Sequence, residues 1–543
     1  MKRIITSFSA ILFVVSSFAQ VLNPTWAKDI APIMYKNCTN CHHVGGAGHG
    51  SLMTYTDANN LAGLIQYHTE NKSMPPWPPD RDYNNYADER HLTDKQINLI
   101  KTWVNNGALA GDTTLAPAPP IYSNSDLITN ADLTGKIPTF TVFSNSDLYQ
   151  CFVIPSGLTQ DEFLTAIELI PGNSSIVHHV LMFQDTTGAA RQKDNADPNP
   201  GYTNFGGIGV ASPILIGAWV PGSRPFIYPQ GLGVKIYKNA DIVLQIHYPS
   251  NSLNQVDSTK FNMKLSASSL RQVIIQPILN HRTSGPGSLI NGPLSIAPNT
   301  IQTFVSKFKN NYTDLSLLAI APHMHLIGKS IKVFSVNAAK DTTPLINIKD
   351  WDFKWQGQYS FQKLTKLPKG DTAFAEAIYD NTAANQNNPN KSNPLQVTLG
   401  EATTNEMMLV YVSFLVYVNG DENFVVDSTD YDKMDSITDA NIDAQTPSGI
   451  EFAGVVSSLQ FYEPYPNPAN NSVKVSFFLP ASSEVSLKVY DMLGQKVAEI
   501  SPKFYKDGFG DMMLNTSNIS SGNYVLELSS SYGSRSKNIS ISK

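Results

Sequence analysis

The alternating pattern of a β-strand is clearest in DIVLQIH, residues 241–247, and in LVYVSF, residues 409–414. In both runs every second side chain is apolar, so one face of the strand can be buried. Similar runs lie around and between them, separated by turn clusters, as in β-sandwiches. One sandwich needs only about 100 residues. We therefore predict two sandwiches in tandem, over residues 125–265 and 266–430.

The composition supports a mainly β, multidomain protein and excludes some classes of function. The chain has 543 residues, enough for about three or four domains. Its 34 Gly and 34 Pro suit a loop-rich fold. The formal net charge is −6, whereas nucleic-acid-binding domains are usually basic, so we expect no nucleic-acid partner. Only 3 Cys are present, so no disulfide framework can hold the fold.

The N-terminus has the pattern of an export signal. Lys2 and Arg3 precede a largely apolar stretch, and a small-x-small site follows at residues 17–19. Residues 1–19 are therefore predicted to be a secretory signal peptide. No other stretch is long and apolar enough to span a bilayer, so we expect no transmembrane segment.

Residues 21–112 have helical rather than strand periodicity. A capping box from Thr93 to Gln96 opens a helix whose apolar side chains share one face. A Pro-rich run then marks a linker over residues 113–124. We therefore predict a separate all-α domain ahead of the sandwiches.

The strongest motif in this helical region is CTNCH, residues 38–42, the C-x-x-C-H attachment site of a c-type haem. Cys38 and Cys41 would form the thioethers, and His42 would be the proximal iron ligand. A redox dithiol and half a zinc site are the alternatives, but the flanking pattern is not βαβ and a second Cys pair is missing. An exported chain suits haem attachment, which happens outside the cytoplasm.

The sixth haem ligand is predicted to be Met74, on a loop stiffened by the prolines that follow it. A thioether ligand raises the haem potential. Met53 and His68 are competitors for this position. With its final amphipathic helix, the segment resembles class I cytochrome c domains.

Five histidines of the β region form a suggestive pattern, as an adjacent pair, a single residue on a strand and an H-x-H motif. They are His178, His179, His247, His323 and His325. Residues i and i+2 of a strand share a face, so the last two can hold one metal ion. Adjacent residues normally face opposite ways, so the strand must bulge or end at the pair. Imidazole suits copper, zinc, iron or nickel, and an added thioether favours copper.

These motifs, followed by Glu-Met-Met at residues 406–408, resemble in their order the copper type II, ascorbate-dependent monooxygenases. This family includes the peptidylglycine α-hydroxylating and dopamine β-monooxygenases. The resemblance covers roughly residues 130–430 and implies two jelly-roll-like sandwiches of eight strands, each holding one copper ion. It implies a first copper on His178, His179 and His247. It implies a second, catalytic copper on His323, His325 and Met407, which directly follows the Glu and is therefore preferred to Met408.

Departures from the family pattern bear on the substrate. Tyr411 matches a family tyrosine and is predicted to be catalytic. Ala321 stands where peptide-hydroxylating members have the arginine that binds a substrate carboxylate, and Leu409 replaces an asparagine. A glycine-terminated peptide is therefore not expected, and the substrate is left as a small organic molecule or peptide. Cys151 is expected to be unpaired.

The resemblance implies a monooxygenase that uses O2 to hydroxylate a C–H bond. Electrons would come from an ascorbate-like reductant or a redox protein and pass through the fused haem to the first copper. One alternative is a surface electron-transfer protein with haem and copper but no oxygenase activity. Another is a surface binding protein whose sandwiches have lost metal.

The last unit, residues 457–543, follows a polar linker at 431–456 and consists of alternating strands. We predict a small Ig-like sandwich. Its YPNP, LGQ and SGNYVLEL blocks resemble the C-terminal sorting domain of the type IX secretion system. That resemblance implies export through the outer membrane, with release or surface attachment. An ordinary carbohydrate-binding or adhesion module is the alternative.

Overall fold

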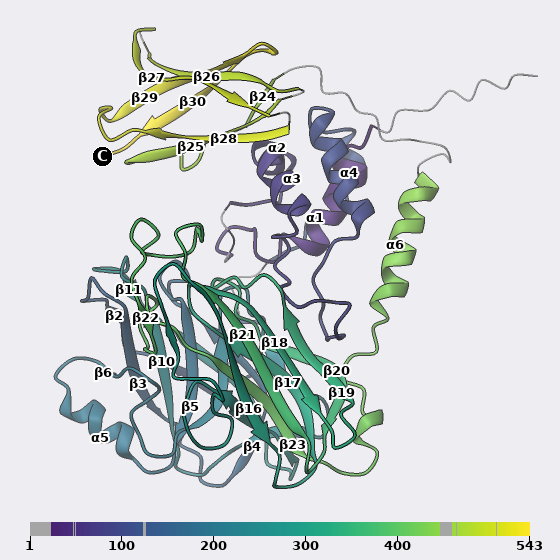
Figure 1. The fold of residues 1–543 in the computed structure, drawn as a ribbon, viewed down its shortest axis with the longest axis vertical. Coiled ribbons are helices and arrows are strands. Elements are labelled where there is room, and N and C mark those ends of the chain that lie inside the picture. The colour runs from purple at the N-terminus through teal and green to yellow at the C-terminus, as the bar shows by residue number, and fades with distance from the viewer. Residues whose placement is uncertain are drawn as a thin grey trace, which may run out of the picture.

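A computed structural model describes residues 23–46, 48, 50–122, 126–445, 459–462, 464–479, 481–492, 494–506 and 508–543. The predicted signal peptide at 1–19 lies outside these residues. The chain is a mainly β, multidomain protein with several sandwich sheets and a small N-terminal helical region (Figure 1). Among the described residues, no helix has the length and apolar character needed to cross a membrane.

The helical region is built around a small apolar core. Its elements are η1 (Trp26–Ile30), α1 (Ala31–Asn37), α2 (Tyr55–Asn60), α3 (Ala62–Glu70) and α4 (Asp94–Asn105), with η2 (Thr113–Leu115) after them. The predicted capping box is present at the start of α4, where Thr93 and Gln96 bond reciprocally. Ile100 and Trp103 of α4 are fully buried, as the amphipathic pattern predicts.

The first sandwich encloses one core between two sheets. One sheet has the order β1 (Leu133–Lys136), β12 (Lys260–Ser266), β4 (Glu162–Ile170), β9 (Leu232–Ile236) and β13 (Arg271–Gln272), with β8 (Phe226–Ile227) beside β4. The other has β6 (Tyr202–Thr203), β3 (Leu148–Pro155), β10 (Asp241–Tyr248), β5 (His179–Asp185) and β7 (Ile214–Trp219). A pair, β2 (Phe140–Thr141) with β11 (Val256–Asp257), and helix α5 (Ala189–Ala196) complete the unit. Every residue of β10, the central strand, is buried.

The second sandwich begins after the chain leaves β13. One sheet has the order β14 (Ile274–Asn280), β23 (Leu409–Val416), β17 (Leu315–His323) and β20 (Tyr359–Leu367). The other has β16 (Ile301–Lys309), β21 (Thr372–Asp380), β18 (Gly328–Val336) and β19 (Thr342–Ile348). A pair, β15 (Ser295–Ile296) with β22 (Val397–Thr398), and the short helix η3 (Asp421–Asn423) accompany them. The chain therefore passes between the sandwiches at residues 272–274.

One sheet of the second sandwich also packs against the first. On β17, Leu317 and Ile320 belong to the core of the second sandwich, whereas Leu318 belongs to the core of the first. Leu364 and Leu415 on neighbouring strands also join the first core. Since strand side chains alternate between faces, one sheet can serve both cores. The two sandwiches therefore share an apolar interface.

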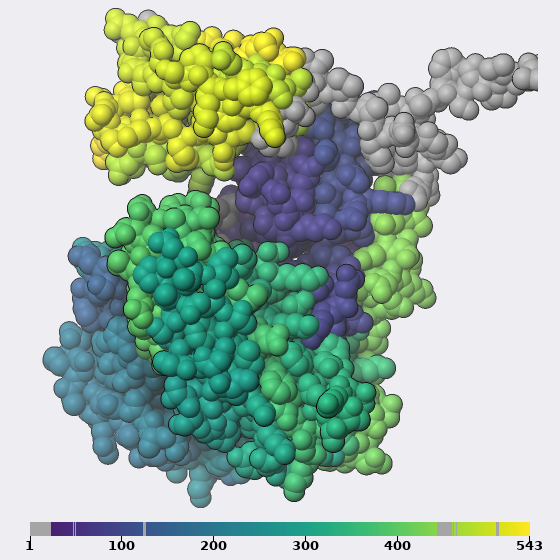
Figure 2. All heavy atoms as spheres, in the orientation of Figure 1, coloured from purple at the N-terminus to yellow at the C-terminus, as the bar shows by residue number. Residues whose placement is uncertain are grey.

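The helical region is attached to the second sandwich by a segment that we call the strap, residues 75–91. Tyr86 of the strap is fully buried in the second core, and its hydroxyl donates a 2.6 Å hydrogen bond to the carbonyl of Leu345. Pro79 forms a bridge with Ile348. Figure 2 shows the helical region between the sandwiches and the C-terminal domain. The Pro-rich linker is thus not the only connection between the helical and β regions.

Helix α6 (Tyr431–Gln445) occupies the first part of the predicted linker at 431–456. The prediction of a linker is corrected for these residues, because this part of the polar stretch forms a helix. The helix lies beside the helical region (Figure 1). Its Asp435 accepts a 3.1 Å hydrogen bond from Arg81 of the strap. The remainder, 446–456, lies outside the described residues.

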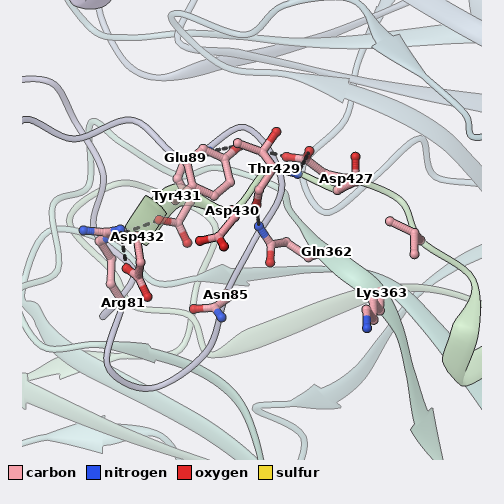
Figure 3. Close-up of a pocket in the computed structure, with 12 residues that line it drawn as sticks. Arg81, Asn85, Glu89, Gln362, Lys363, Asp427, Thr429, Asp430, Tyr431 and Asp432 are labelled. Atoms are coloured by element: carbon pink, nitrogen blue, oxygen red, sulfur yellow. Dashed lines mark hydrogen bonds and ion pairs between the residues drawn. The ribbon is translucent and has the colours of Figure 1, made fainter. Parts of the chain in front are cut away.

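A cavity of about 370 Å³ lies where the strap, β20 and the start of α6 meet (Figure 3). Most of its lining residues have polar or charged side chains. Arg81 contacts Glu89 at 2.8 Å and Asp432 at 3.4 Å. None of the predicted metal ligands is among its lining residues. The candidate metal chemistry therefore lies elsewhere.

The C-terminal domain is a separate sandwich with its own core. One sheet has the order β24 (Gln460–Phe461), β25 (Ser472–Leu479) and β28 (Gly508–Asn515); the other has β27 (Lys496–Tyr505), β26 (Ser483–Asp491), β29 (Gly522–Ser530) and β30 (Gly533–Ile541). It packs against α3, where a Cβ on Gly63 would lie 2.4 Å from the ring of Tyr462. Only glycine permits so close an approach.

Candidate metal centres

The first cluster of histidines forms where β5 and β10 lie side by side. His247 on β10 pairs across the ladder with His179, the first residue of β5. His178 precedes the strand, and its backbone N–H donates a 2.9 Å hydrogen bond to the carbonyl of His247. Because the strand begins at the second histidine, the adjacent pair need not face opposite ways. One ligand nitrogen from each residue lies within 4.8 Å of the others.

The chemistry of this cluster fits a metal ion. Nδ1 of His178 lies 3.2 Å from Nδ1 of His179, close to the spacing of two nitrogen ligands whose metal bonds are each about 2.0 Å long. Both ring nitrogens of His247 are buried without a hydrogen-bond partner. Burial lowers the pKa of His178 to about 3. Burial also holds the pKa of His179 well below its usual value. These two imidazoles are therefore neutral near pH 7, which is the state that binds metal.

The second cluster contains His323 and His325, whose ring centroids are 5.1 Å apart. His323 is the last residue of β17, but His325 lies beyond the strand. The expectation that both share a strand face is therefore wrong. His325 is held instead by its Nδ1, 3.2 Å from the carbonyl of Asn405, and Nδ1 of His323 bonds to Oε1 of Gln356. Such contacts assign the proton to Nδ1 and leave Nε2 as the ligand atom.

Glu406 organises the loop that carries His325. Its carboxylate accepts hydrogen bonds of 2.8 Å from the backbone N–H groups of His325 and Ile327. Burial raises the pKa of Glu406 to about 8 despite these bonds. Met408 is fully buried in the second core, whereas Met407 keeps a small exposed surface. Because the side chain of Met408 is part of the core, Met407 is the thioether candidate for this cluster.

Tyr411 lies on the face of the sheet that also carries His323. In the ladder of β17 and β23, Tyr411 pairs with Ala321 and Leu409 pairs with His323. Burial raises the pKa of Tyr411 to about 12, so its phenol is neutral near pH 7. The two positions at which the sequence departs from the family are thus beside the predicted ligand and the predicted catalytic tyrosine, and both are apolar.

An aromatic ring separates the two clusters, and sequence reasoning missed it. Phe353 stacks on His178 with ring centroids 4.6 Å apart and meets His325 edge-on at 5.8 Å. It belongs to the loop between β19 and β20, which also supplies Gln356 to His323. The aromatic run WDFKW at residues 351–355 was the available sequence signal, but nothing local relates it to the histidines.

Asp147 is a second residue that sequence reasoning missed. Its Oδ1 lies 3.5 Å from Nε2 of His247, beyond ordinary hydrogen-bond range, and its Oδ2 accepts a 2.9 Å bond from the Thr403 hydroxyl. Burial alone would raise the pKa of Asp147, but its contacts with His247 and Thr403 outweigh burial and lower it well below its usual value. Asp147 thus connects the first cluster to the loop that carries Asn405 and Glu406.

The predicted haem-attachment motif follows directly after α1. The backbone N–H groups of Cys41 and His42 both donate to the carbonyl of Cys38, and both thiols are unpaired. Nδ1 of His42 lies 3.2 Å from the carbonyl oxygen of Gly50. A ligating histidine usually has such a contact, which fixes its tautomer and ring orientation. The residues present therefore fit a covalently attached haem.

The candidates for the sixth haem ligand lie at the end of α3 and after it. The backbone N–H of Met74 donates a 3.1 Å bond to the carbonyl of His68, and the Ser73 hydroxyl lies 2.9 Å from Nδ1 of His68. Burial lowers the pKa of His68, and the nearby charges of Lys474 and His42 lower it further. Met74 and His68 are therefore neighbours, and His68 lies near the predicted proximal ligand.

Comparisons with known families match three segments of the chain. Residues 134–255 match the copper type II ascorbate-dependent monooxygenase N-terminal domain, and residues 300–435 match the C-terminal domain of the same family. Residues 463–542 match a secretion system C-terminal sorting domain. The matched ranges do not include the helical region.

Three curated relatives carry the name DBH-like monooxygenase protein 1. The Gallus gallus protein is 22% identical over 269 residues, 46% of this chain and 40% of its own length. The Mus musculus protein is 23% identical over 293 residues (50% and 44%), and the Homo sapiens protein 23% over 430 residues (69% and 65%). The chain thus spans less than two thirds of each relative. A Faecalibacterium prausnitzii β-glucuronidase structure aligns over 44% of this chain and 37% of its own, at 10% identity and a TM-score of 0.11, too low to support any argument.

Proposed function

Because this chain belongs to the copper type II ascorbate-dependent monooxygenases, a family of oxidoreductases, we propose that it is an exported enzyme that hydroxylates a C–H bond of an organic substrate. We further propose that a c-type haem in the helical region relays electrons to its copper ions. The two central sandwiches are taken to be of the jelly-roll type and the C-terminal one to be Ig-like.

The observation that carries this proposal is the first cluster of histidines. Its three imidazoles come from two segments, the adjacent pair before β10 and His247 on β10 itself. One ligand nitrogen of each lies within 4.8 Å of the others, and both ring nitrogens of His247 are buried without a hydrogen-bond partner. A buried polar atom without a partner is costly unless a ligand satisfies it. Three histidines at such a distance support copper binding by His178, His179 and His247, the ligand set that the family resemblance implies.

The second copper would be held by His323, His325 and Met407. When bound, copper in these sites supplies the one-electron chemistry that activates O2, and a thioether favours its reduced state. Burial keeps His323 and His325 neutral by lowering their pKa values to about 3 and about 4. Gln356 and Asn405 hold the Nδ1 protons of these two rings, so that Nε2 is presented to the metal.

The sheet surface beside the second cluster supports an apolar substrate contact. Ala321 and Leu409 carry neither charge nor hydrogen-bonding side-chain groups, so a substrate carboxylate would gain no ion pair there. Tyr411 provides a polar group on this surface, and we assign to it the orientation of the substrate. The substrate class that fits is a small organic molecule or peptide whose reacting end is uncharged.

In the helical region, Cys38 and Cys41 would attach the haem, and His42 would be its proximal ligand. Such a haem supplies a one-electron carrier close to the copper domains. The sixth ligand is proposed to be Met74, with His68 as the competitor, since the two residues are neighbours. The electrons that reduce the haem would come from an ascorbate-like reductant or a redox protein.

Export is supported at the C-terminal end by the sorting-domain match, which implies secretion or a cell-surface location. The predicted signal peptide and the assignment to the type IX secretion machinery, with removal of the domain after export, belong to the proposal.

The test is to purify the exported protein, load it with copper, and measure copper and haem per chain before screening C–H substrates with O2 and ascorbate. We expect about two coppers and one haem, and a hydroxylated product that contains one oxygen atom from labelled O2. The variant His178→Ala should lose about one copper and the product. Two coppers without product from any substrate would contradict oxygenation.

One observation favours the alternative, an electron-transfer protein without oxygenase activity. His247 and His325 are only 1% and 3% exposed, and Phe353 covers a face of His178. This leaves little room for a substrate in the structure as it stands. Copper reduction by the haem without substrate-dependent O2 consumption would select this alternative.

A further inference from the structure

One loop contacts both predicted copper clusters and comes close to the haem-attachment motif. We call residues 351–357, between β19 and β20, the bridging loop. Its Trp351 is anchored in the second core and donates a 3.2 Å hydrogen bond from Nε1 to the carbonyl of His325. Phe353 and Trp355 follow at alternate positions and are half-buried. The bridging loop is therefore fixed by Trp351 in the second core, while its other two aromatic residues lie outside that core.

Trp355 and the haem-attachment motif both approach Gly222, in the turn after β7. A Cβ built on Gly222 would lie 3.5 Å from Sγ of Cys41 and 3.8 Å from Cζ3 of Trp355. The thiol that would carry the haem and the indole ring thus both lie within 4 Å of the position that a Cβ on this glycine would occupy. Gly222 has a φ of +82°, a backbone conformation that favours glycine. Since glycine has no side chain, it adds no atoms between the thiol and the indole ring.

Phe353 reaches the copper clusters on the same loop. Its ring is stacked on His178 at 4.6 Å with an interplanar angle of 17°. The Nε2 of Gln356 donates a 2.8 Å hydrogen bond to the carbonyl of Phe353, which holds the turn that separates Phe353 from Trp355. Two aromatic side chains of one loop therefore lie toward the two sites, Trp355 near Cys41 and Phe353 against His178.

We propose that Trp355 and Phe353 form the electron path between the haem attached at Cys41 and the copper held at His178. This inference rests on the proposed function, since it requires both cofactors. One electron leaves the ferrous haem, which becomes ferric, and one Cu(II) becomes Cu(I), so the step needs no further reactant. The aromatic rings shorten the gaps that the electron must cross. They are positioning residues for electron transfer and do not contact the substrate.

The test is pulsed photoreduction of the full exported protein, anaerobic and loaded with Cu(II). Haem absorbance reports how fast the reduced haem is reoxidised, and electron paramagnetic resonance reports loss of Cu(II). In Trp355→Leu and Phe353→Leu we expect the reoxidation rate to fall by about tenfold or more, equivalent to about 1.4 kcal/mol in activation free energy. Trp355→Phe and Phe353→Tyr, which keep an aromatic ring, should recover most of the rate. Lys354→Ala is the matched control, because this side chain is exposed on the same loop.

The outcomes separate the inference from the proposed function. If haem in the unaltered protein is not reoxidised by bound Cu(II), the haem relay itself fails. If the unaltered protein transfers electrons and both leucine variants do so equally fast, the relay stands and the path through this loop is overturned. A slow Trp355→Leu with an unchanged Phe353→Leu would overturn the assignment of Phe353. Copper and haem content and circular dichroism, equal across the variants, would exclude misfolding as the cause.

Discussion

Replacing Gln356 by Leu should weaken copper binding at the second cluster with little effect on the first. In the structure Oε1 of Gln356 is the acceptor for the Nδ1 proton of His323. Leucine has a similar size but no acceptor, so metal binding through Nε2 would leave a buried N–H unsatisfied. That costs about 1–3 kcal/mol. Loss of such an outer partner typically lowers metal affinity about 10- to 100-fold, and since about 1.4 kcal/mol corresponds to tenfold, the two figures agree.

The assay is a competitive copper titration in a His178→Ala background, so that the second site is measured by itself. Gln358→Leu is the control, because Gln358 is exposed on the segment just after the bridging loop. Unchanged affinity in Gln356→Leu would refute the assignment of the Nδ1 proton. An equal loss in the Gln358 control would show that the loop as a whole, and not this contact, sets the affinity.

Three other perturbations test separate parts of the structure. Burial alone would raise the pKa of Asp421, but hydrogen bonds, chiefly from Arg271, lower it to about 2. Because the pKa is lower in the folded state than in the unfolded state, this pair contributes about 2 kcal/mol of stability above pH 4. That stability is lost as the pH falls toward 2. Urea unfolding of Asp421→Asn should show that deficit at pH 7 and only a small fraction of it at pH 2, where the folded carboxyl is about half protonated. An equal deficit at both pH values would contradict it. Met408→Ala should cost about 2–5 kcal/mol of unfolding free energy as a core truncation and leave copper content unchanged. Met407→Ala should instead lower the affinity for Cu(I) with little loss of stability. If copper titration and unfolding gave the reverse pattern, the roles of the two methionines would be exchanged. Met74→Ala should abolish the charge-transfer band of methionine-ligated ferric haem while covalent haem is retained, and an unchanged spectrum would point to another sixth ligand.

Local sequence patterns were enough for the class of the fold and for the family. The run at 241–247 is the central buried strand of its sheet, because strand alternation depends only on neighbouring residues. The copper-dependent monooxygenase family was expected from the order of short motifs and is confirmed by the matches to both of its domains. The predictions of individual ligands and of the haem stay predictions.

Predictions were weaker where a residue's surroundings come from distant parts of the chain. His325 was expected on a strand, but bonds from the loop at Asn405 and Glu406 place it beyond the strand end. Likewise, α6 is a helix in a polar stretch that was predicted to be a linker, and its contacts to the strap come from a segment more than three hundred residues earlier. No local pattern carries such information.

The sequence by itself determined which ligand side chains were available, namely imidazoles, a thioether and a C-x-x-C-H motif, because ligand chemistry belongs to each residue. It also determined which runs would form buried strands, because side-chain alternation is a local property. Only the tertiary structure decided which of these groups meet. The apolar interface through Leu318 brings the two sandwiches together, and the strap holds the helical region beside them. Phe353 therefore lies between two groups of histidines, and Trp355 lies near Cys41, because packing of separate domains sets these contacts.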